Sequence, residues 1–327
     1  MSEVYIRVEN LKKYFATKRG MLHAVDDVSF EIHKGETLGL VGESGCGKST
    51  LGRCLIRLLD STSGKVLLKN SNDDGYTDIT KASSHDMKAL RKRVQIVFQD
   101  PYSCLNPRLS VWELIAEPLI VNHVYTDKNE MRKRIRALMD TVGLAERLEN
   151  SYPHELDGGR RQRIGIARSL ALNPEFIVLD EPVSALDVCI QAQILNLLNS
   201  LQKEFKYTYV FISHNLSVVR HVSDRIAVMY LGQIVELSDY RELFKTPLHP
   251  YTQALLSAIP LAKLDVKRER IILEGDVPSP IEPENACRFA GRCRYAKDIC
   301  RTTPPALKEI LPGHFAACHY AKENLNQ

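Results

Sequence analysis

The sequence predicts an α/β fold, in which short buried strands end in polar turns and alternate with helices. Residues 37–41 are an apolar run typical of a buried strand, and a helical pattern over residues 51–59 follows a glycine-rich turn. Three more apolar runs end in polar residues, at 94–98, 176–179 and 209–213. Ligands bind beyond the carboxyl ends of strands in such sheets, so these turns form the candidate site.

The turn after residues 37–41 has the spacing of a phosphate-binding loop. Its glycines let backbone N–H groups converge on a polyphosphate, and the helix that follows points its N-terminal partial positive charge at the same anion. Lys48 would reach the β- and γ-phosphates, and the Ser49 hydroxyl would ligate Mg²⁺. The alternative is a structural glycine-rich turn. The residues of the loop are Gly42, Glu43, Ser44, Gly45, Cys46, Gly47, Lys48, Ser49 and Thr50.

Strand patterns at residues 4–8 and 24–32 come before the loop and predict a small antiparallel sheet beside the nucleotide core. Phe15 could stack on an adenine ring, because the face of an aromatic ring accepts a base without sequence readout. Tyr14 is a competing candidate, and a place for Phe15 in the core is the alternative. A short strand is expected at residues 65–68.

The polar residues at the later strand ends complete the candidate site. Gln99 could contact Mg²⁺ or the attacking water, or could instead cap a loop. Asp180 follows an apolar strand and would hold the Mg²⁺ shell, while Glu181 is placed to polarise a water; a helix cap or solvated turn is the alternative. His214 could contact the γ-phosphate or orient the water, although an isolated histidine is usually structural.

The middle of the chain is helical from residue 111 to about 148, which predicts an inserted helical subdomain. Its end is a Gly-Gly pair that opens a helix at 161–172, a second helix N-terminus suited to an anion. Residues 225–236 predict a hairpin that turns at 231–232.

Composition sets the cellular context. The net charge of +4 is too small by itself to indicate nucleic-acid binding. No run of about 18 apolar residues occurs, and no signal peptide is visible, so we expect a chain that does not span a membrane. The eight cysteines are therefore interpreted as cytosolic, where structural disulfides are rare.

Taken together, these motifs resemble the ATP-binding subunits of ABC transporters over residues 4–245. His249, Pro250 and Tyr251, within residues 247–260, look like the C-terminal extension of oligopeptide/dipeptide-type importers. Residues 183–188 and 215–220 resemble the second member of a heterodimeric pair. Nickel importers share the extension, so import of nickel or another small solute is the alternative. The stretches that carry the family motifs are 42–50, Gln99, 156–162, 179–182, 184–187 and His214.

The resemblance implies a P-loop NTPase fold with an antiparallel β subdomain, a helical subdomain at about 101–168 and a Cys-rich extension. The ATP-binding domain would span 1–245 and the extension 246–327. Two ATPase subunits would sandwich two ATPs and drive two transmembrane permease subunits, supplied by an extracytoplasmic substrate-binding protein. The chain would lie on the cytoplasmic face of the membrane. Residues 100–108 would form the groove for a permease coupling helix.

A soluble ABC ATPase that acts in nucleic-acid repair or translation is a less favoured class, because such chains usually carry two cassettes or a long coiled coil. A redox module built on the C-terminal cysteines is another. Neither a second cassette nor a coiled-coil pattern is present in the sequence. We expect no nucleic-acid partner.

Four cysteines crowd a C-terminal tail that has little core-forming pattern. Four cytosolic thiols in a short segment usually indicate a metal. Zinc sites favour C-x₂₋₄-C pairs, which are missing here, and four thiolates can hold a [4Fe–4S] cluster. The resemblance to peptide-importer ATPases with a similar tail implies such a cluster, with zinc or four unliganded thiols as alternatives. The metal would order a tail that lacks enough apolar residues to order itself. Cys293→Ser should therefore loosen residues after about 280 and leave ATP affinity largely unchanged, because the phosphate-binding loop precedes the tail. The four residues are Cys287, Cys293, Cys300 and Cys318.

The signature departs from the family pattern Leu-Ser-Gly-Gly-Gln. Here the sequence reads Leu156, Asp157, Gly158, Gly159 and Arg160. The usual serine donates a hydrogen bond to the γ-phosphate held by the partner, whereas an ionised aspartate can only accept. Arg160 could neutralise Asp157 or contact phosphate itself. We therefore expect an asymmetric heterodimer, in which the site with this signature hydrolyses ATP poorly.

Overall fold

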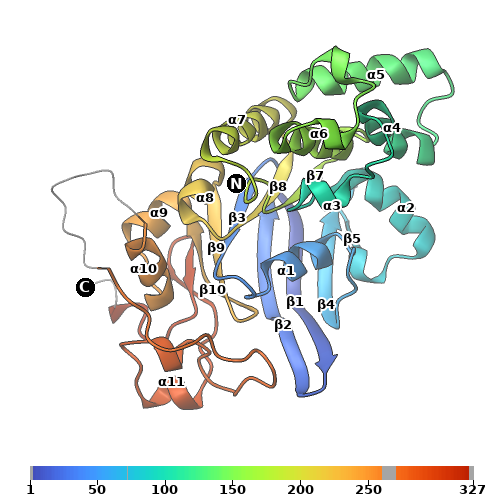
Figure 1. Ribbon diagram of the computed structural model, residues 1–327. Helices are drawn as coiled ribbons and strands as arrows, with labels where there is room; N and C mark the ends of the chain where they lie inside the picture. The colour runs from blue at the N-terminus through green and yellow to red at the C-terminus, as the bar shows by residue number, and fades with distance from the viewer. Residues whose placement is uncertain (1–2, 72, 260–269, 324–327) are drawn as a thin grey trace. The chain divides into compact units, whose positions relative to one another are not determined.

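The computed structural model describes residues 3–71, 73–259 and 270–323 (Figure 1). It divides into two compact units, which are described separately. The first unit combines Met1–Lys81 with Phe211–Gln327, and the second is Ala82–Val210. The predicted helical subdomain at 101–168 falls inside the second unit, and the C-terminal extension belongs to the first. A domain boundary near residue 245 stays a prediction.

A small antiparallel sheet opens the first unit, as the alternating N-terminal segments predict. Its order is β2-β1-β4-β5, and every neighbouring pair runs antiparallel. The first two strands are longer than expected, because their backbone pairing continues up to the turn between them, where Thr17 lies opposite Gly20. The bounds are β1 (Val4–Thr17), β2 (Gly20–His33), β4 (Ser63–Lys69) and β5 (Tyr76–Asp78).

A second run of strands in the first unit carries the phosphate-binding loop, in the order β11-β12-β10-β9-β3. The buried strand β3 pairs in parallel with β9, and β9 and β10 form the predicted hairpin. Leu231 and Gly232 turn this hairpin with φ of 42° and 82°. The bounds are β3 (Thr37–Val41), β9 (Arg225–Tyr230), β10 (Gln233–Asp239), β11 (Lys308–Leu311) and β12 (His314–Ala316).

The helix after the loop, α1, packs against β1 and β2 (Figure 1). It begins three residues earlier than the sequence pattern predicts and ends four residues earlier. Gly47 caps its start in the left-handed region, and Arg57 has a φ of 50° just beyond its end. The other helices of this unit are short. The bounds are α1 (Lys48–Leu55), α8 (Leu216–Val222), α9 (Tyr240–Lys245), α10 (Pro250–Ser257) and α11 (Asp298–Thr302), with 3-10 turns at Ile79–Lys81 and Ala290–Arg292.

The second unit pairs strands β6 (Val94–Val97) and β7 (Phe176–Asp180) in parallel, with Val97 opposite Leu179. The second unit ends at Val210, within strand β8 (Thr208–Ser213). The predicted helical region is confirmed, but it is broken after residue 121 into separate helices that pack on one another. The helices are α2 (Ser84–Arg93), α3 (Pro101–Cys104), α4 (Val111–Val121), α5 (Lys128–Thr141), α6 (Gly158–Leu170) and α7 (Val188–Phe205), with 3-10 turns at Glu146–Leu148 and Pro153–Glu155.

The C-terminal extension packs on both sheets of the first unit. It orders itself by adding strands to β10, with Glu236 opposite Ala316, and Leu248, Ala316 and Ala321 form a small core of their own. At another point it pairs with the edge of β2, where the His23 N–H donates to the Pro280 carbonyl at 2.9 Å. The extension therefore has an apolar core of its own, and a structural role for a metal stays a prediction.

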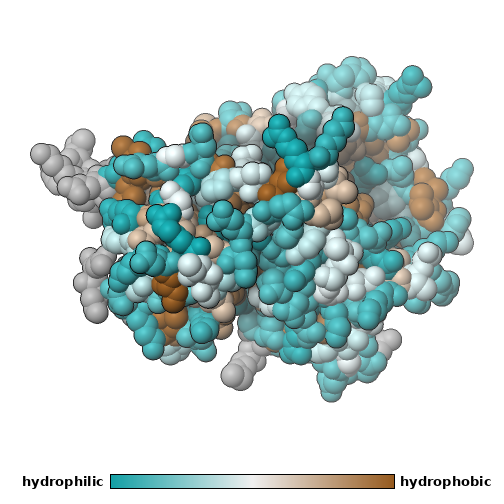
Figure 2. All heavy atoms as spheres, turned by 90° about the horizontal axis from the view of Figure 1, so that it is seen from below, coloured by the Kyte–Doolittle hydropathy of each residue, from teal (hydrophilic) through white to brown (hydrophobic). Residues whose placement is uncertain are grey.

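Hydrophobic residues on the face shown in Figure 2 lie in small separate patches among hydrophilic ones. Within the described ranges, no helix is both long and apolar enough to cross a membrane.

Candidate functional site

The phosphate-binding loop joins β3 to α1 in the first unit, as predicted. Two of its glycines are required by close backbone approaches. A Cβ at Gly42 would lie 2.1 Å from the Met229 carbonyl oxygen, and a Cβ at Gly47 would lie 2.0 Å from that of Ala24. Lys48 is buried, and its ammonium donates to the carbonyls of Gly42 at 2.8 Å and Glu43 at 2.9 Å. The lysine therefore folds back over the loop that it would serve.

The structure separates the two aromatic candidates for adenine. Tyr14 is engaged: its ring stacks on His23 with centroids 3.9 Å apart, and its hydroxyl donates to Asp26. Phe15 is 37% exposed at the end of β1, and the Lys13 ammonium lies 4.8 Å from its ring centroid. The alternative that Phe15 belongs to the core is thus wrong, and stacking on adenine stays a prediction for Phe15.

His214 also belongs to the first unit. It follows β8 and is exposed. Its role toward phosphate or water stays a prediction.

The second unit brings Gln99 and Glu181 together. The Gln99 side-chain amide donates to the Glu181 carboxylate at 3.0 Å. Each lies two residues past the Val97–Leu179 pair, so parallel pairing of β6 and β7 puts both at one sheet edge. Glu181 also has a φ of 47°, a left-handed conformation that is uncommon outside glycine and often found at functional sites.

Asp180, the last residue of β7, is 1% exposed. A carboxylate at the end of a strand in such a sheet lies where ligands bind, and a role for Asp180 in holding Mg²⁺ stays a prediction. This second unit therefore holds an acidic pair and an amide at one strand edge.

The signature stretch begins α6. Asp157 caps this helix, since its carboxylate accepts from the Arg160 N–H at 2.7 Å. The Arg160 guanidinium lies 3.4 Å from the same carboxylate, so the pairing that would neutralise Asp157 is present. Gly158 and Gly159 form the first turn, and a Cβ at Gly159 would lie 2.6 Å from Ile190. Glycine here lets α6 approach the start of α7.

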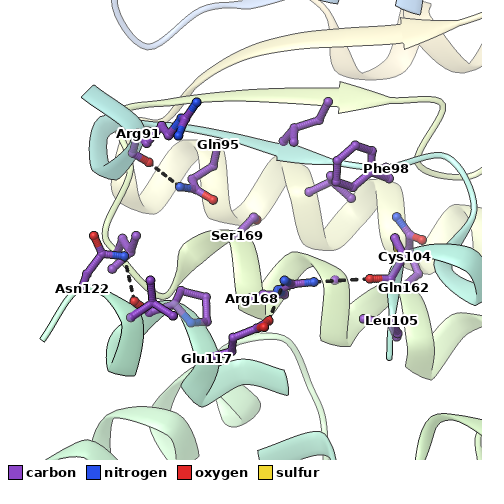
Figure 3. Close-up of a pocket in the computed structure, with 16 residues that line it drawn as sticks. Arg91, Gln95, Phe98, Cys104, Leu105, Glu117, Asn122, Gln162, Arg168 and Ser169 are labelled. Carbon is purple, nitrogen blue, oxygen red and sulfur yellow. Dashed lines mark hydrogen bonds and ion pairs between the residues drawn. The ribbon is translucent and has the colours of Figure 1, made fainter. Parts of the chain in front are cut away.

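A cavity of about 390 Å³ lies in the second unit between β6, α4 and α6 (Figure 3). Cys104 and Leu105, from the stretch predicted to receive a coupling helix, line it. Arg168 crosses its wall and bonds to Glu117 at 2.7 Å and to the Cys104 carbonyl at 3.3 Å. Cys104 and Leu105 thus line a cavity whose other walls include α4, and a role for it in receiving a coupling helix stays a prediction.

The four C-terminal cysteines converge on one small cavity of about 20 Å³, which has room for about one water molecule. All four are free thiols. Burial raises the pKa of Cys287 to about 11 and also raises that of Cys293. Over the part of the chain that the structure describes, no group of three or more His, Cys, Asp or Glu side chains is placed to hold a metal ion.

The extension also contacts the phosphate-binding loop, which no sequence signal indicated. The Glu43 N–H donates to the Tyr251 hydroxyl, and the Glu43 carboxylate pairs with Arg292. These contacts count against the expectation that Cys293→Ser leaves ATP affinity largely unchanged, because that expectation treated order along the chain as separation in space.

Comparison with known proteins assigns these features to a class. The ABC transporter family profile matches residues 25–184. A dimeric ATP-binding cassette solved with ADP and Pi, MJ0796, superposes with a TM-score of 0.64 at 30% identity, over 72% of this chain and 99% of that chain. CbiO1 from Clostridium perfringens, part of the ABC transporter complex cbiONQ, gives 0.64 at 29% identity, over 75% of this chain and 92% of that chain. The protein is an ABC-type ATPase, in which ATP hydrolysis is coupled to transport.

The subfamily follows from the full-length relatives. The profile described as "Oligopeptide/dipeptide transporter, C-terminal region" matches residues 235–300. The oligopeptide transport ATP-binding protein AppF of Bacillus subtilis is 51% identical, covering 97% of each chain, and OppF of the same organism is 48% identical over 98% of each. The chain belongs to the ATP-binding proteins of oligopeptide/dipeptide ABC importers.

Proposed function

We propose that this chain hydrolyses ATP to power the uptake of dipeptides or oligopeptides through partner membrane subunits. The observation that carries the proposal is the Gln99–Glu181 hydrogen bond beside Asp180, in a chain 51% identical to an oligopeptide transport ATP-binding protein over nearly its whole length. An amide and a carboxylate held together at a strand edge suit the positioning and polarisation of a water.

In this proposal the chain binds ATP through the residues that the sequence predicts. Phe15 stacks on adenine, the loop from Gly42 to Thr50 binds the phosphates, and Lys48 leaves its carbonyl partners for the β- and γ-phosphates. Ser49, Gln99 and Asp180 hold Mg²⁺, which neutralises phosphate charge when bound.

Glu181 then takes the role of general base toward the attacking water. His214 contacts the γ-phosphate. The signature residues Asp157, Gly158, Gly159 and Arg160 face the ATP of a second ATPase subunit.

The partners proposed are that second ATPase subunit in a heterodimer, two transmembrane permease subunits and an extracytoplasmic substrate-binding protein. The chain would lie peripherally on the cytoplasmic face of the membrane. The cavity between α4 and α6 would receive a permease segment, since its walls combine apolar Leu105 and Val121 with the polar Glu117–Arg168 pair.

The test is ATP binding and peptide uptake by the assembled complex in vesicles. Lys48→Ala should weaken MgATP binding and stop uptake, whereas Lys88→Ala, an exposed lysine on α2, should change neither. Unchanged ATP affinity in Lys48→Ala would show that this loop is not the nucleotide site. Energised uptake of Ni²⁺ in place of peptide would assign the other solute class.

We further propose that the two ATP sites of the heterodimer are unequal. An ionised Asp157 cannot donate to a γ-phosphate, and its charge repels the phosphate even when it is paired with Arg160. Loss of a charge-assisted hydrogen bond there costs about 1.5–3 kcal/mol, which is roughly ten- to a hundredfold in rate if the bond acts in the transition state.

The asymmetry has a direct test, because serine also caps helices and Asp157→Ser should leave α6 intact. Glu181→Gln should abolish ATP hydrolysis, while the matching change in the partner should leave a substantial fraction. Adding Asp157→Ser to Glu181→Gln should then raise the residual rate by roughly ten- to a hundredfold. Equal loss from the two single glutamine variants, with no gain from Asp157→Ser, would refute the asymmetry.

We propose a [4Fe–4S] cluster on Cys287, Cys293, Cys300 and Cys318, with zinc as the alternative. Support comes from the convergence of all four thiols on one cavity. The cavity has room for only about one water molecule, so a cluster would need more space than these side chains leave. Anaerobically purified protein should contain iron and acid-labile sulfide and absorb broadly in the visible. Stoichiometric zinc without iron would favour the zinc alternative. If neither metal is found, the four thiols are unliganded.

A further inference from the structure

We propose that Arg292 and Tyr251 of the C-terminal extension are positioning residues for ATP binding, which act by holding Glu43 of the phosphate-binding loop. The inference rests on the proposed role of that loop in binding ATP.

Glu43 is held at three of its groups. Its N–H donates to the Tyr251 hydroxyl at 2.9 Å. Its carboxylate accepts two bonds from the Arg292 guanidinium, at 2.8 and 3.2 Å. Its carbonyl accepts from the Lys48 ammonium at 2.9 Å. Glu43, one of the two loop residues whose carbonyls hold the Lys48 ammonium, is therefore fixed mainly by the extension, more than 200 residues away along the chain.

Both supports are themselves rigid. Tyr251 is 0% exposed, and its ring packs against Tyr230 with centroids 4.7 Å apart and against Phe289 at 5.5 Å. Its backbone N–H bonds to the His249 imidazole, which caps α10. The Arg292 side chain is 9% exposed, and its bonds to Glu43 raise the pKa of the guanidinium. The Glu43 side chain is 29% exposed, and the bidentate geometry of the pair is one in which an ion pair fixes position rather than merely adding charge.

The consequence for ATP is twofold. The pair neutralises a carboxylate that would otherwise repel a polyphosphate from inside its own binding loop. It also fixes the backbone on which the loop N–H groups must converge, so less ordering is left for the nucleotide to impose. Residues 277–280 of the extension flank the same stretch, around a cavity of about 260 Å³ with Glu43–Cys46.

The experiment compares Arg292→Gln, Arg292→Lys and Tyr251→Phe in the full-length chain. The readouts are the dissociation constant for MgATP, the KM and kcat of ATP hydrolysis in the assembled complex, and thermal unfolding. Arg292→Gln should raise the dissociation constant and KM by roughly three- to tenfold, with a smaller change in kcat, because ground-state ordering of the loop is lost. Arg292→Lys should recover part of this, since it keeps the charge without the bidentate fork.

Arg294→Gln is the matched control: this arginine lies two residues on, is exposed and lies over the Tyr295 ring. It should leave MgATP affinity unchanged. Combining Glu43→Gln with Arg292→Gln should weaken binding no more than Arg292→Gln alone, as expected for residues that act through each other.

Folded Arg292→Gln protein with wild-type MgATP affinity would overturn the inference, even if its unfolding temperature fell. If Arg292→Gln does not fold, the MgATP affinity of Tyr251→Phe, which removes only one hydroxyl, is the test. A wild-type affinity in that variant would overturn the inference. Absence of MgATP binding by the wild-type chain would instead refute the proposed function.

Discussion

Removal of the Glu236 carboxylate should detach the C-terminal extension from β10. This side chain is 0% exposed and accepts from three donors: the Leu248 N–H at 2.7 Å, the His249 N–H at 2.9 Å and the His314 Nε2 at 2.7 Å. All three donors belong to the extension, so one carboxylate on the sheet secures both ends of it.

The magnitude follows from the donors left behind. Glu236→Ala strands two buried backbone N–H groups, each costing about 1–3 kcal/mol, and leaves a cavity, so the free energy of unfolding should fall by about 3–6 kcal/mol. Glu236→Gln keeps one acceptor oxygen, but its NH₂ group replaces the other oxygen and faces an N–H donor. The loss of that hydrogen bond should cost about 1–3 kcal/mol. Against a typical total of about 5–15 kcal/mol, the alanine variant should lose the extension first.

Urea unfolding followed by circular dichroism measures the total, and hydrogen exchange at the amides of Leu248 and His249 measures the local loss. Glu242→Ala, an exposed glutamate on α9, is the control and should lie within about 0.5 kcal/mol of wild type. If Glu236→Ala stayed within about 1 kcal/mol of wild type with unchanged amide protection, the carboxylate would not be the anchor.

Three further outcomes are expected. Burial lowers the pKa of His249 to about 4, so the unfolded chain binds a proton that the folded chain does not, and stability should fall by up to about 3 kcal/mol as the pH drops from about 6.5 towards 4. His249→Asn keeps the helix cap and should flatten this dependence in urea titrations at each pH. Cys293→Ser should weaken MgATP binding, because Cys293 is next to Arg292 in the chain, but the effect should be smaller than that of Arg292→Gln. Unchanged MgATP affinity would show that the cysteines do not influence the phosphate-binding loop. Phe15→Ala should weaken MgATP binding about fivefold or more by loss of stacking, with Tyr14→Phe as the control.

The parts of the site that follow one another along the chain could be predicted from the sequence. The strand at residues 37–41 matches β3, and the loop and helix come directly after it. Gln99 and Glu181 lie 82 positions apart, yet each ends an apolar strand, and the strand-end rule brought them to one edge. Local pattern was sufficient here because sheet pairing converts strand ends into neighbours.

No comparable sequence rule predicts the contacts between the extension and the phosphate-binding loop. Tyr251 is 208 positions from Glu43 and Arg292 is 249 away, and neither lies at a strand end or in a motif with fixed spacing. The choice between Tyr14 and Phe15 was also hidden, since it depends on the partners His23 and Asp26 across the β1–β2 hairpin. Pairings that depend on tertiary packing leave no periodicity in the sequence to detect.

Glu43 shows why the loop and the extension must be considered together. A carboxylate in a phosphate-binding loop opposes the function of the loop, since two unit charges about 4 Å apart repel by about 1 kcal/mol in water and about 4 kcal/mol at a protein surface. Sequence alone gives no reason for an acid there. The bidentate Arg292 supplies one, because the paired carboxylate becomes a handle by which the extension holds the loop backbone. The acid is useful only if the arginine is present, so the two residues should tolerate replacement together better than Arg292 tolerates it alone.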